Sequence, residues 1–413
     1  MKKVGIFFII IFGSIFLLYG LNYTDGKIYN TLEKEILLDN LVGMTKTEVQ
    51  DYADKVDIQL EIEYQYNSIV DKDLVISQGT EVGSKVSNGD VVKIIISKGE
   101  VPVEIYQKYQ VNELGKVPIM MYHGIVDMES SSTNYIGGNV DKDGYSRTSE
   151  AFRQDLEFYY QSGYRMVRLD DYVNGIIDVE IGKSPIILTF DDGNENNFKV
   201  LGEENGELII DPNCAVGILE EFKKKYSDYG VTATFFVNSD LFGQEEYNEK
   251  ILKWLIENGY DIGNHTMTHV DFTKISIDET IEEVGGLYKL LDGIIPDKYV
   301  SIVALPFGSP YKVTHENYSA ILNGEFSGNV YQTRAALRVG WEAEVSCFDV
   351  EFTPSFLKRI RAYDNEGKEF DIEMNFEMLE DTKYISDGDV NTIVVLDGDK
   401  DRVNGKYSNV ISY

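Results

Sequence analysis

Cysteine is nearly absent from this sequence, and its scarcity limits the chemistry open to the chain. The 413 residues contain two cysteines, Cys214 and Cys347. Two cysteines cannot build the disulfide framework that holds small secreted domains together, and they cannot supply a thiolate metal cluster. The sequence leaves open a single bridge between them.

Positive charge is also scarce. Lys and Arg total 38 against 70 Asp and Glu, for a net charge of -32. The acidic residues are spread along the chain, which argues against a nucleic-acid backbone as partner. A neutral or cationic ligand is easier to accommodate. The content of 43% hydrophobic and 12% aromatic residues is enough to bury real cores, and the length predicts two domains plus a leader.

One apolar run near the amino terminus predicts a membrane anchor over residues 1–23. Lys2 and Lys3 precede Val4–Leu21, an uncharged run about long enough to span a bilayer as a helix. The basic flank should stay in the cytoplasm, so we expect a single-pass membrane protein whose later residues are extracytoplasmic. A cleaved signal peptide is the alternative, but no small-residue cleavage site follows the run. No cysteine follows it either, which argues against a lipid anchor.

Residues 36–101 have the pattern of a small α+β domain. The segment Thr45-Lys46-Thr47-Glu48 offers a helix cap with an acidic first turn. Ile58–Tyr66 alternates apolar and polar residues as a half-buried strand does. Two more β-rich runs follow, and glycines separate them at turns.

This region resembles a PASTA domain over nearly its full length. Such domains are associated with binding peptidoglycan or its fragments, which composition alone would not suggest. The alternative is a spacer that holds the catalytic part away from the membrane. The resemblance rests on Val42-Gly43-Met44, Val75–Gln78, the turn at Gly83 and Gly89, and the closing Ser97-Lys98-Gly99.

Residues 115–413 alternate apolar β-type runs with helical patterns such as Glu150–Gln161 and Asn248–Glu257. Strands that are nearly all apolar imply a buried parallel sheet. An open doubly wound sheet and a closed barrel both fit. The candidate chemical residues fall at the ends of several different strands, which favours an α/β barrel. The predicted strands are VPIMMY, RMVRL, PIILTF, VTATFFV, VSIVAL and TIVVL.

Two carboxylates follow the apolar strand Ile186–Phe190. At a turn opened by Gly193, Asp191 and Asp192 can both reach one pocket in different orientations, so that one binds a metal and the other acts as a base. Further along, His265 and His269 would share one face if their segment is helical. Two imidazoles and one carboxylate leave an open position for water on zinc or a similar divalent ion.

Each half of this pattern is weak alone. An Asp-Asp pair at a strand end is often a helix cap or a solvated turn, and a lone histidine is often an ordinary core or surface residue. The chain has only four histidines, so a pair four residues apart arises by chance in roughly a few per cent of cases, and a motif becomes the better interpretation.

Together, Thr189–Gly193 and His265–His269 resemble the first two motifs of the polysaccharide deacetylases, the carbohydrate esterase group that includes the nodulation chitooligosaccharide deacetylases. The resemblance implies a distorted (β/α)7-type barrel. It also implies that Asp191 is the catalytic base and that Asp192, His265 and His269 bind a divalent metal, with Zn2+ expected.

At the remaining motifs, this chain departs from the pattern of that family. The third normally begins with an arginine that orients the base, but here it reads Ala304-Leu305-Pro306-Phe307. We expect Pro306 and Phe307 to shape the substrate groove, with the Phe307 backbone N–H contributing to an oxyanion hole. The last motif normally supplies a histidine, whereas Val394–Gly398 contains none.

A replacement histidine ends the strand Pro118–Tyr122. This segment resembles the Met-x-Tyr-His signature of deacetylases that act on exported or wall glycans. His123 at a barrel strand end would face the pocket of Asp191 and protonate the leaving amine, and Tyr122 would contact substrate. A substrate hydrogen bond or a structural turn is the alternative for His123. We expect His315 to be an ordinary surface residue and Trp341 to pack within the barrel.

The sequence therefore predicts a membrane-anchored, metal-dependent deacetylase that removes N-acetyl groups from a wall or extracellular amino-sugar polymer, most plausibly peptidoglycan. Two alternatives stay open. One is a wall-glycan-binding protein that has lost catalysis, which the missing arginine and carboxyl-terminal histidine suggest. The other is an O-acetyl esterase that uses the same metal site.

Overall fold

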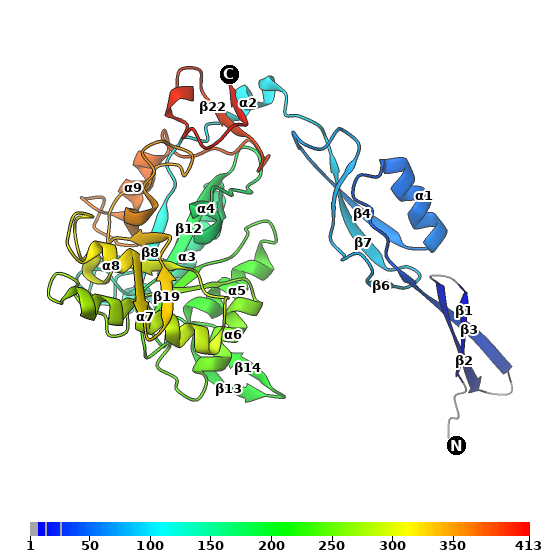
Figure 1. The fold of residues 1–413 in the computed structure, drawn as a ribbon, viewed down its shortest axis with the longest axis horizontal. Helices are drawn as coiled ribbons and strands as arrows, with labels where there is room; N and C mark the ends of the chain where they lie inside the picture. The colour runs from blue at the N-terminus through cyan, green and yellow to red at the C-terminus, as the bar shows by residue number, and fades with distance from the viewer. Residues whose placement is uncertain (1–6, 13–14, 25–26) are drawn as a thin grey trace. The chain divides into compact units, whose positions relative to one another are not determined.

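The computed structural model describes residues 7–12, 15–24 and 27–413, with side chains described from Ile36 onward. The chain divides into two compact units, Met1–Ile105 and Tyr106–Tyr413 (Figure 1). The second unit contains every residue for which the sequence predicts a chemical role.

The first described residues form strands rather than a helix. β1 (Phe7–Phe12), β2 (Ile15–Thr24) and β3 (Lys27–Leu37) pair antiparallel in sequence order. No helix within the described ranges is long and apolar enough to cross a membrane. The helix predicted over Val4–Leu21 is therefore not found there. The remaining parts of that run, residues 4–6 and 13–14, lie outside the described residues.

The rest of the first unit is the expected small α+β domain. Thr45 caps its helix, and Thr45 and Glu48 form the predicted capping box. β4 runs parallel to β7, and β5 runs antiparallel to β7 on its other side. The helix buries Val49 and Ala53 against the sheet. The elements are α1 (Lys46–Val56), β4 (Gln59–Gln65), β5 (Val75–Gln78), β6 (Lys85–Val86) and β7 (Val91–Ser97).

A curled sheet of eight strands forms the centre of the second unit, and every strand pairing within it is parallel. A bridge joins Leu337, in the strand at one edge of the sheet, to Leu357, which lies shortly before the strand at the opposite edge. The sheet therefore curls like a half-barrel. The strands in order are β20 (Ala335–Leu337), β17 (Ile302–Ala304), β16 (Asp261–Asn264), β15 (Thr234–Val237), β12 (Ser184–Phe190), β8 (Ile119–Tyr122) and β21 (Ile360–Arg361), with β11 (Tyr164–Met166) also paired to β12.

The helices of this unit follow the expected pattern. Thr148 caps α3, and Phe152, Leu156 and Tyr159 are fully buried on one face, as the apolar spacing predicts. Gly163 follows with a φ of 85°, which suits the glycine expected after the helix. The helices are α2 (Val103–Tyr109) at the junction of the units, α3 (Ser149–Gln161), α4 (Leu169–Val173), α5 (Ala215–Lys225), α6 (Asn248–Glu257), α7 (Ile277–Ile294), α8 (Tyr318–Leu322) and α9 (Ile372–Leu379).

Short strand pairs lie outside the main sheet. The predicted strand TIVVL is one of them, because β22 pairs with β23 rather than joining the other predicted strands. β13 and β14 form an antiparallel hairpin between residues 200 and 210. The pairs are β9 (Ile125–Val126) with β10 (Arg147–Thr148), β13 (Val200–Glu204) with β14 (Glu207–Ile210), β18 (Asn323–Phe326) with β19 (Asn329–Gln332), and β22 (Ile393–Val395) with β23 (Val410–Ser412).

Strand alternation divides the sheet into two faces. Tyr122 and Phe190 belong to the core beneath α3 and α5, whereas Ile119 and Ile187 belong to a second core that includes Leu337. Successive side chains on a strand point to opposite faces. Residues 123 and 191, each one position beyond a strand end, therefore continue the face that carries Ile119 and Ile187.

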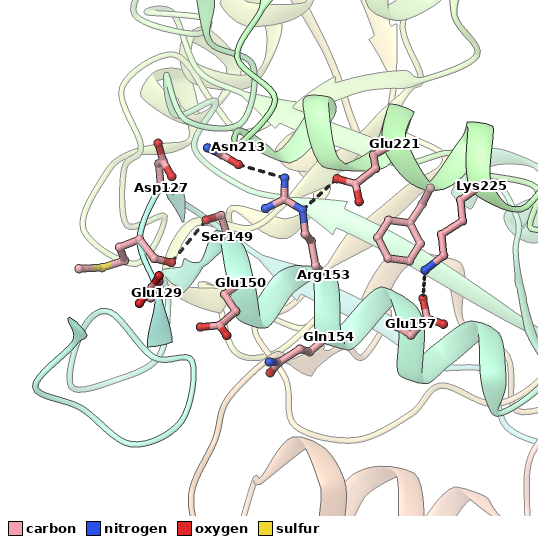
Figure 2. A pocket seen from close by; sticks show the side chains of 12 residues that line it. Asp127, Glu129, Ser149, Glu150, Arg153, Gln154, Glu157, Asn213, Glu221 and Lys225 are labelled. Atoms are coloured by element: carbon pink, nitrogen blue, oxygen red, sulfur yellow. Dashed lines mark hydrogen bonds and ion pairs between the residues drawn. The ribbon is translucent and has the colours of Figure 1, made fainter. Parts of the chain in front are cut away.

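A cavity of about 640 Å³ lies on the outer surface, lined by residues of α3 and α5 (Figure 2). Arg153 and Glu221 form an ion pair across it, and Lys225 pairs with Glu157. None of the residues with a predicted chemical role lines this cavity. Elsewhere in this unit, Cys214 and Cys347 are buried and do not form a bridge.

Candidate active site

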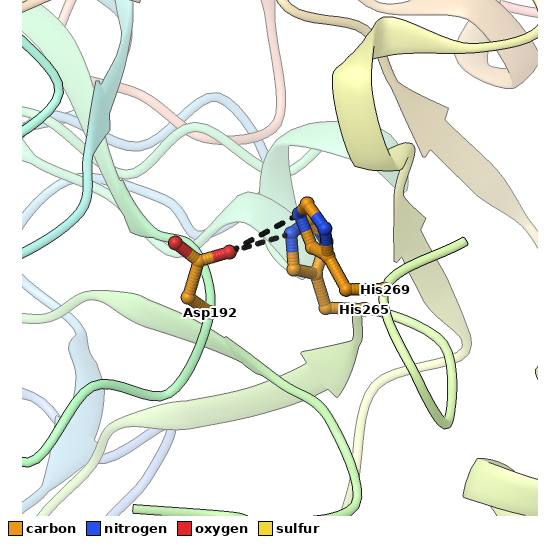
Figure 3. Close-up of side chains that lie close together, drawn as sticks. All are labelled: Asp192, His265 and His269. Carbon is orange, nitrogen blue, oxygen red and sulfur yellow. Dashed lines mark ion pairs between the residues drawn. The ribbon is translucent and has the colours of Figure 1, made fainter. Parts of the chain in front are cut away.

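Asp192, His265 and His269 converge at the carboxyl ends of two strands, β12 and β16, between which β15 lies. Asp192 follows β12, and the histidines follow β16. The Asp192 Oδ1 atom lies 3.2 Å from His265 Nε2 and 3.3 Å from His269 Nε2. Figure 3 shows both rings facing this one carboxylate oxygen. One ligand atom from each residue lies within 4.8 Å of the others.

The two histidines meet through a loop, not through the helix considered from their spacing. His265 directly follows β16, and the chain then turns through Thr266 and His269, whose φ values are 65° and 56°. Such left-handed conformations are uncommon outside glycine and gather at functional sites. The turn brings the two ring centroids to 4.9 Å.

His265 is oriented by the next strand of the sheet. Its Nδ1 donates to the carbonyl of Ala304, at the end of β17, over 2.8 Å. This bond leaves Nε2 without a proton and directed at Asp192, as in metal-binding histidines whose second nitrogen is held by a carbonyl. Burial lowers the pKa of His265, but the contact with Asp192, the charge of Asp191 and the bond to Ala304 together raise that pKa above its ordinary value.

The donor set suits a divalent cation. Asp192 Oδ1 and His265 Nε2 are buried, and neither has a hydrogen-bond partner within the described residues. Burial raises the pKa of Asp192, but the close contact with His265 and the charges of the nearby histidines bring that pKa well below its ordinary value, so the carboxylate is charged. Two imidazole nitrogens and one carboxylate oxygen are ligands that zinc accepts while keeping a position open.

Asp191 directly precedes Asp192 and forms an ion pair with an arginine. We call the site formed by Asp191, His123 and the three candidate metal ligands the pocket. It is 1% exposed, and Arg359 is fully buried. Arg359 Nη1 and Nη2 donate to the two carboxylate oxygens over 2.7 Å and 2.6 Å, a bidentate pair. Burial alone would raise the pKa of Asp191, but the charge of Arg359 holds it below its ordinary value. The carboxylate is therefore ionised and cannot rotate freely.

Arg359 corrects the expectation that no arginine orients the base. It immediately precedes β21, and its Nε donates to the carbonyl of Arg338 over 3.0 Å. Its Nη1 also donates to Thr189 Oγ1 over 3.1 Å. The arginine missing at Ala304 is thus supplied by another strand. Sequence reasoning missed it, although Lys358-Arg359-Ile360-Arg361 is a rare basic cluster in an acidic chain.

His123 completes the pocket from the end of β8. Its Nε2 lies 4.0 Å from Asp191 Oδ2, and its side chain is 12% exposed. Its carbonyl accepts a hydrogen bond from Asn197, and its ring packs edge-on against Tyr145 at 4.9 Å. Nδ1 has no hydrogen-bond partner in the described part of the chain. Burial lowers the pKa of His123.

The predicted substrate contacts separate into different environments. Tyr122 is 1% exposed, and its hydroxyl bonds to Asp155 and Tyr159 in the core, so it does not face the pocket as expected. Strand alternation is the reason, because it points His123 and Tyr122 to opposite faces. Pro306 is buried. Phe307 is 56% exposed, with its ring 4.7 Å from that of His269.

The two remaining residues singled out from the sequence lie apart from this constellation. His315 is half-buried in a turn, where its Nδ1 accepts a hydrogen bond from the Asn317 backbone. Trp341 was expected inside the barrel but is 46% exposed, because it lies beyond the end of β20 and packs against Phe370.

Comparison with known proteins identifies two regions of the chain. A model of the polysaccharide deacetylase family matches residues 178–321. A model of the PASTA domain matches residues 36–98. The first match includes both adjacent aspartates and both histidines of the triad, whereas His123 and Arg359 lie outside it.

Solved structures show weaker likenesses. The chain is 18% identical to the deacetylase PplD of Streptococcus pyogenes, solved with acetate, at a TM-score of 0.45 over 63% of this chain and 97% of that one. It is 11% identical to a de-N-acetylase of Aggregatibacter actinomycetemcomitans, at a TM-score of 0.38 over 59% and 94%. For the peptidoglycan deacetylase PdaC of Bacillus subtilis the values are 22%, 0.24, 33% and 55%.

The family matches place named domains on both units of the structure, and the adjacent aspartates and paired histidines lie within the second match. The chain therefore carries a PASTA domain followed by a polysaccharide deacetylase domain, and the second domain makes it a hydrolase that acts on carbon–nitrogen bonds other than peptide bonds.

Proposed function

We propose that this protein removes N-acetyl groups from an amino-sugar polymer of the cell wall, with peptidoglycan as the substrate, and that it needs a divalent metal, Zn2+, to do so. One observation carries the proposal. The open cluster of Asp192, His265 and His269 lies beside an ionised, arginine-held Asp191, and a buried histidine stands 4.0 Å from that aspartate. These are the groups that amide hydrolysis requires.

Asp192, His265 and His269 would hold the ion. When bound, a divalent ion there supplies a Lewis acid that polarises the acetyl carbonyl and makes a water easier to deprotonate. Phe307 lies against His269 and borders this position with an exposed ring. Its backbone N–H is the donor that we propose for the developing oxyanion.

Asp191 acts as the general base. It accepts a proton from the attacking water as the water oxygen bonds to the acetyl carbon. Its pKa lies below the ordinary value because Arg359 balances its charge, so the base is ready at neutral pH. The bidentate contact also fixes the direction in which the carboxylate receives the proton.

His123 acts as the general acid. The carbon–nitrogen bond breaks as the sugar nitrogen takes a proton from the imidazole, which releases acetate and a free amine. The ring is positioned by its packing on Tyr145 and by the bond from Asn197 to its carbonyl. Asp191 and His123 lie 4.0 Å apart. Asp191 accepts the proton of the attacking water, and His123 supplies the proton that the leaving amine takes.

The ion pair at Asp191 also weakens the case for an inactive glycan-binding protein. That alternative drew on the missing arginine and the missing carboxyl-terminal histidine. Arg359 and His123 stand where those two groups would be needed.

Acetate release from N-acetylated chitooligosaccharides and peptidoglycan, with and without a chelator, tests the proposal. We expect Asp192→Ala and His265→Ala to abolish both metal binding and acetate release. His315→Ala, the histidine outside the pocket, is the matched control and should retain both. Normal acetate release in Asp192→Ala or His265→Ala would contradict the site assignment. Faster release from O-acetylated than from N-acetylated substrates would instead favour the esterase.

We further propose that the PASTA domain binds wall glycan and that the apolar run Val4–Leu21 holds the protein at the membrane, with the enzyme outside the cytoplasm. The first part is supported by the family match alone, and the second by the sequence alone. Co-sedimentation of the full chain with insoluble peptidoglycan should weaken when residues 36–101 are deleted. Fractionation should recover the full chain with membranes, and recovery in the soluble fraction would contradict the anchor.

A further inference from the structure

Two arginines stand out because they have no carboxylate partner. The chain contains nine arginines among 70 acidic residues. Seven of the nine form ion pairs with Asp or Glu. Arg338 and Arg361 make no such pair within the described residues, although carboxylates outnumber basic residues in this chain. The second of them lies beside the pocket.

Strand geometry places Arg361 on the pocket side of the sheet. β21 runs parallel to β8, with Arg361 opposite Met121. Side chains two residues apart on a strand share a face, and Arg359 uses this face to reach Asp191. Arg361 therefore lies one step nearer the carboxyl end of the sheet. On β8 the residue level with Arg361 is Met121, and His123 lies two residues further toward the same end of the sheet.

Aromatic contacts fix the position of the guanidinium group. Its carbon lies 5.0 Å from the ring centroid of Tyr145 and 4.6 Å from that of Tyr363. The Tyr145 ring in turn packs on His123. Cation–π contacts engage the flat faces of a guanidinium, so its N–H donors at the edge stay free for an anion. No described residue accepts a hydrogen bond from this half-buried side chain.

Arg338 differs in its surroundings. Its guanidinium carbon lies 5.1 Å from the ring of Phe356 and 5.9 Å from that of Trp341. Within the described residues, the Phe356 ring packs on Tyr318 and the Trp341 ring packs on Phe370, not on His123 or a triad histidine. Of the two arginines, Arg361 is the one connected to the proposed acid, through the single side chain of Tyr145.

We propose that Arg361 binds an anionic substituent, a carboxylate or a phosphate ester, carried by the glycan next to the reacting acetamide. This inference rests on the proposed deacetylase function and names the substrate class of the same site. Arg361 offers a planar fork of donors that matches either anion. Tyr145, which is 39% exposed, offers an aromatic face for the sugar that carries the anion.

Local charge explains why such a residue would set specificity. The chain is strongly acidic, with a net charge of -32, so an anionic glycan would meet repulsion on approach. An arginine without a carboxylate partner offsets that repulsion at one place. Neutral glycans gain nothing from it, so the effect appears as a difference between substrates.

The test compares kcat/KM for three N-acetylated oligosaccharides of equal length: a neutral chitooligosaccharide, one containing N-acetylmuramic acid, and one bearing a phosphodiester. We expect wild type to prefer one of the anionic substrates, and which one it prefers identifies the source of the anion. Arg361→Gln should lower the ratio of anionic to neutral kcat/KM by roughly 10- to 100-fold, the usual effect of a charged hydrogen bond.

Two further variants separate charge from structure. Arg361→Lys keeps the charge and should restore much of the ratio. Arg153→Gln removes the same charge from the outer cavity and should leave the ratio at the wild-type value. A ratio unchanged in Arg361→Gln, including an equal loss on all three substrates, would overturn the inference.

Calorimetric binding of the same oligosaccharides to the full chain decides the question independently of turnover. Anionic and neutral Kd values should differ in wild type and converge in Arg361→Gln, and Kd values that stay apart in the variant would refute the role of Arg361. If wild type released no acetate from any substrate, the proposed deacetylase function would fail, while the binding ratio would still decide the role of Arg361.

Discussion

Asp191 in the pocket and the pair of Glu113 and Asp387 elsewhere in the deacetylase domain are buried carboxyl groups, but of these three only Asp191 has an arginine partner. Asp191 is 1% exposed and paired with Arg359. Glu113 and Asp387 are 2% and 0% exposed, and neither forms an ion pair with a basic residue in the described ranges. Glu113 accepts hydrogen bonds from the Tyr384 hydroxyl over 2.6 Å and the Val394 N–H over 2.7 Å.

The pKa values of these groups move in opposite directions. Burial raises the pKa of Asp387 to about 6, and burial with the nearby charge of Asp387 raises the pKa of Glu113 well above its ordinary value. Burial acts on Asp191 in the same sense, yet Arg359 brings its pKa below the ordinary value. The neutral hydrogen-bond donors at Glu113 do not reverse the effect of burial, whereas Arg359, with His265 and His123 nearby, does so at Asp191. The ionised state of Asp191 thus depends on the cation beside it.

The largest expected effect comes from neutralising Asp191, with the neutralisation of Asp387 as the comparison. Asp191→Asn should lower kcat/KM for acetate release by about 10³- to 10⁴-fold, because the amide cannot accept the proton. Asp387→Asn should leave kcat/KM at the wild-type value, since that carboxyl lies outside the pocket. Metal content measured on both variants should match wild type. Comparable activity losses in the two would break the distinction between these carboxyls.

Removing the cation should have the next largest effect. Arg359→Met leaves Asp191 buried without a counter-charge, so the pKa of Asp191 should rise and kcat/KM at neutral pH should fall by about 10²-fold. The free energy of unfolding in denaturant should fall by about 3–5 kcal/mol, as for a broken buried pair.

Arg402→Met is the matched control for that change. Arg402 pairs with the buried Asp349 in the same domain over 2.6 Å, away from the pocket. We expect lower stability but unchanged kcat/KM in this variant. If both arginine variants lost activity equally, the loss would reflect stability and not the state of the base.

The smallest expected effect is a pH dependence of stability that the pair of Glu113 and Asp387 produces. The pKa of Asp387 is about 6 in the folded chain, above the ordinary value of 3.8, so the folded state binds more protons between these values. Stability should therefore fall as pH rises from about 4 to 6 and stay level above, by up to roughly 3 kcal/mol for a shift of about two units.

Thermal unfolding from pH 4 to 8 measures this slope. Asp387→Asn should flatten part of it, and Glu113 and Asp261, whose pKa values are also raised, should contribute to the rest. A stability that instead increased through this window in wild type would show that the pair is charged and compensated, which would remove its contrast with Asp191.

The sequence predicted the α/β class and the long strands because those strands are continuous apolar runs. β12 is buried at all seven of its positions, and its apolar residues are evident in the sequence. β16, β20 and β21 were not predicted, because Asp261–Asn264, Ala335–Leu337 and Ile360–Arg361 do not lie in long apolar runs. β16 also contains Asp261 and Asn264, and such polar residues at a pocket rim obscure a strand pattern.

The predicted site residues form two groups. The adjacent aspartates and the paired histidines carry a local spacing, so the sequence alone could single them out, although it suggested a helix where the structure has a loop. Arg359 carries no local signal, because it lies 168 positions from Asp191 and meets it only through the curl of the sheet. Tyr122 was misjudged because the motif names it without the face on which it lies.

The bridge between Leu337 and Leu357 joins β20 to the segment that carries Arg359. All three members of the metal cluster precede this segment in the chain, whereas the partner of the base follows the bridge. The cation that keeps Asp191 ionised is thus among the last side chains of this pocket to be synthesised, and a chain that ends before Arg359 would contain the whole triad but not that cation.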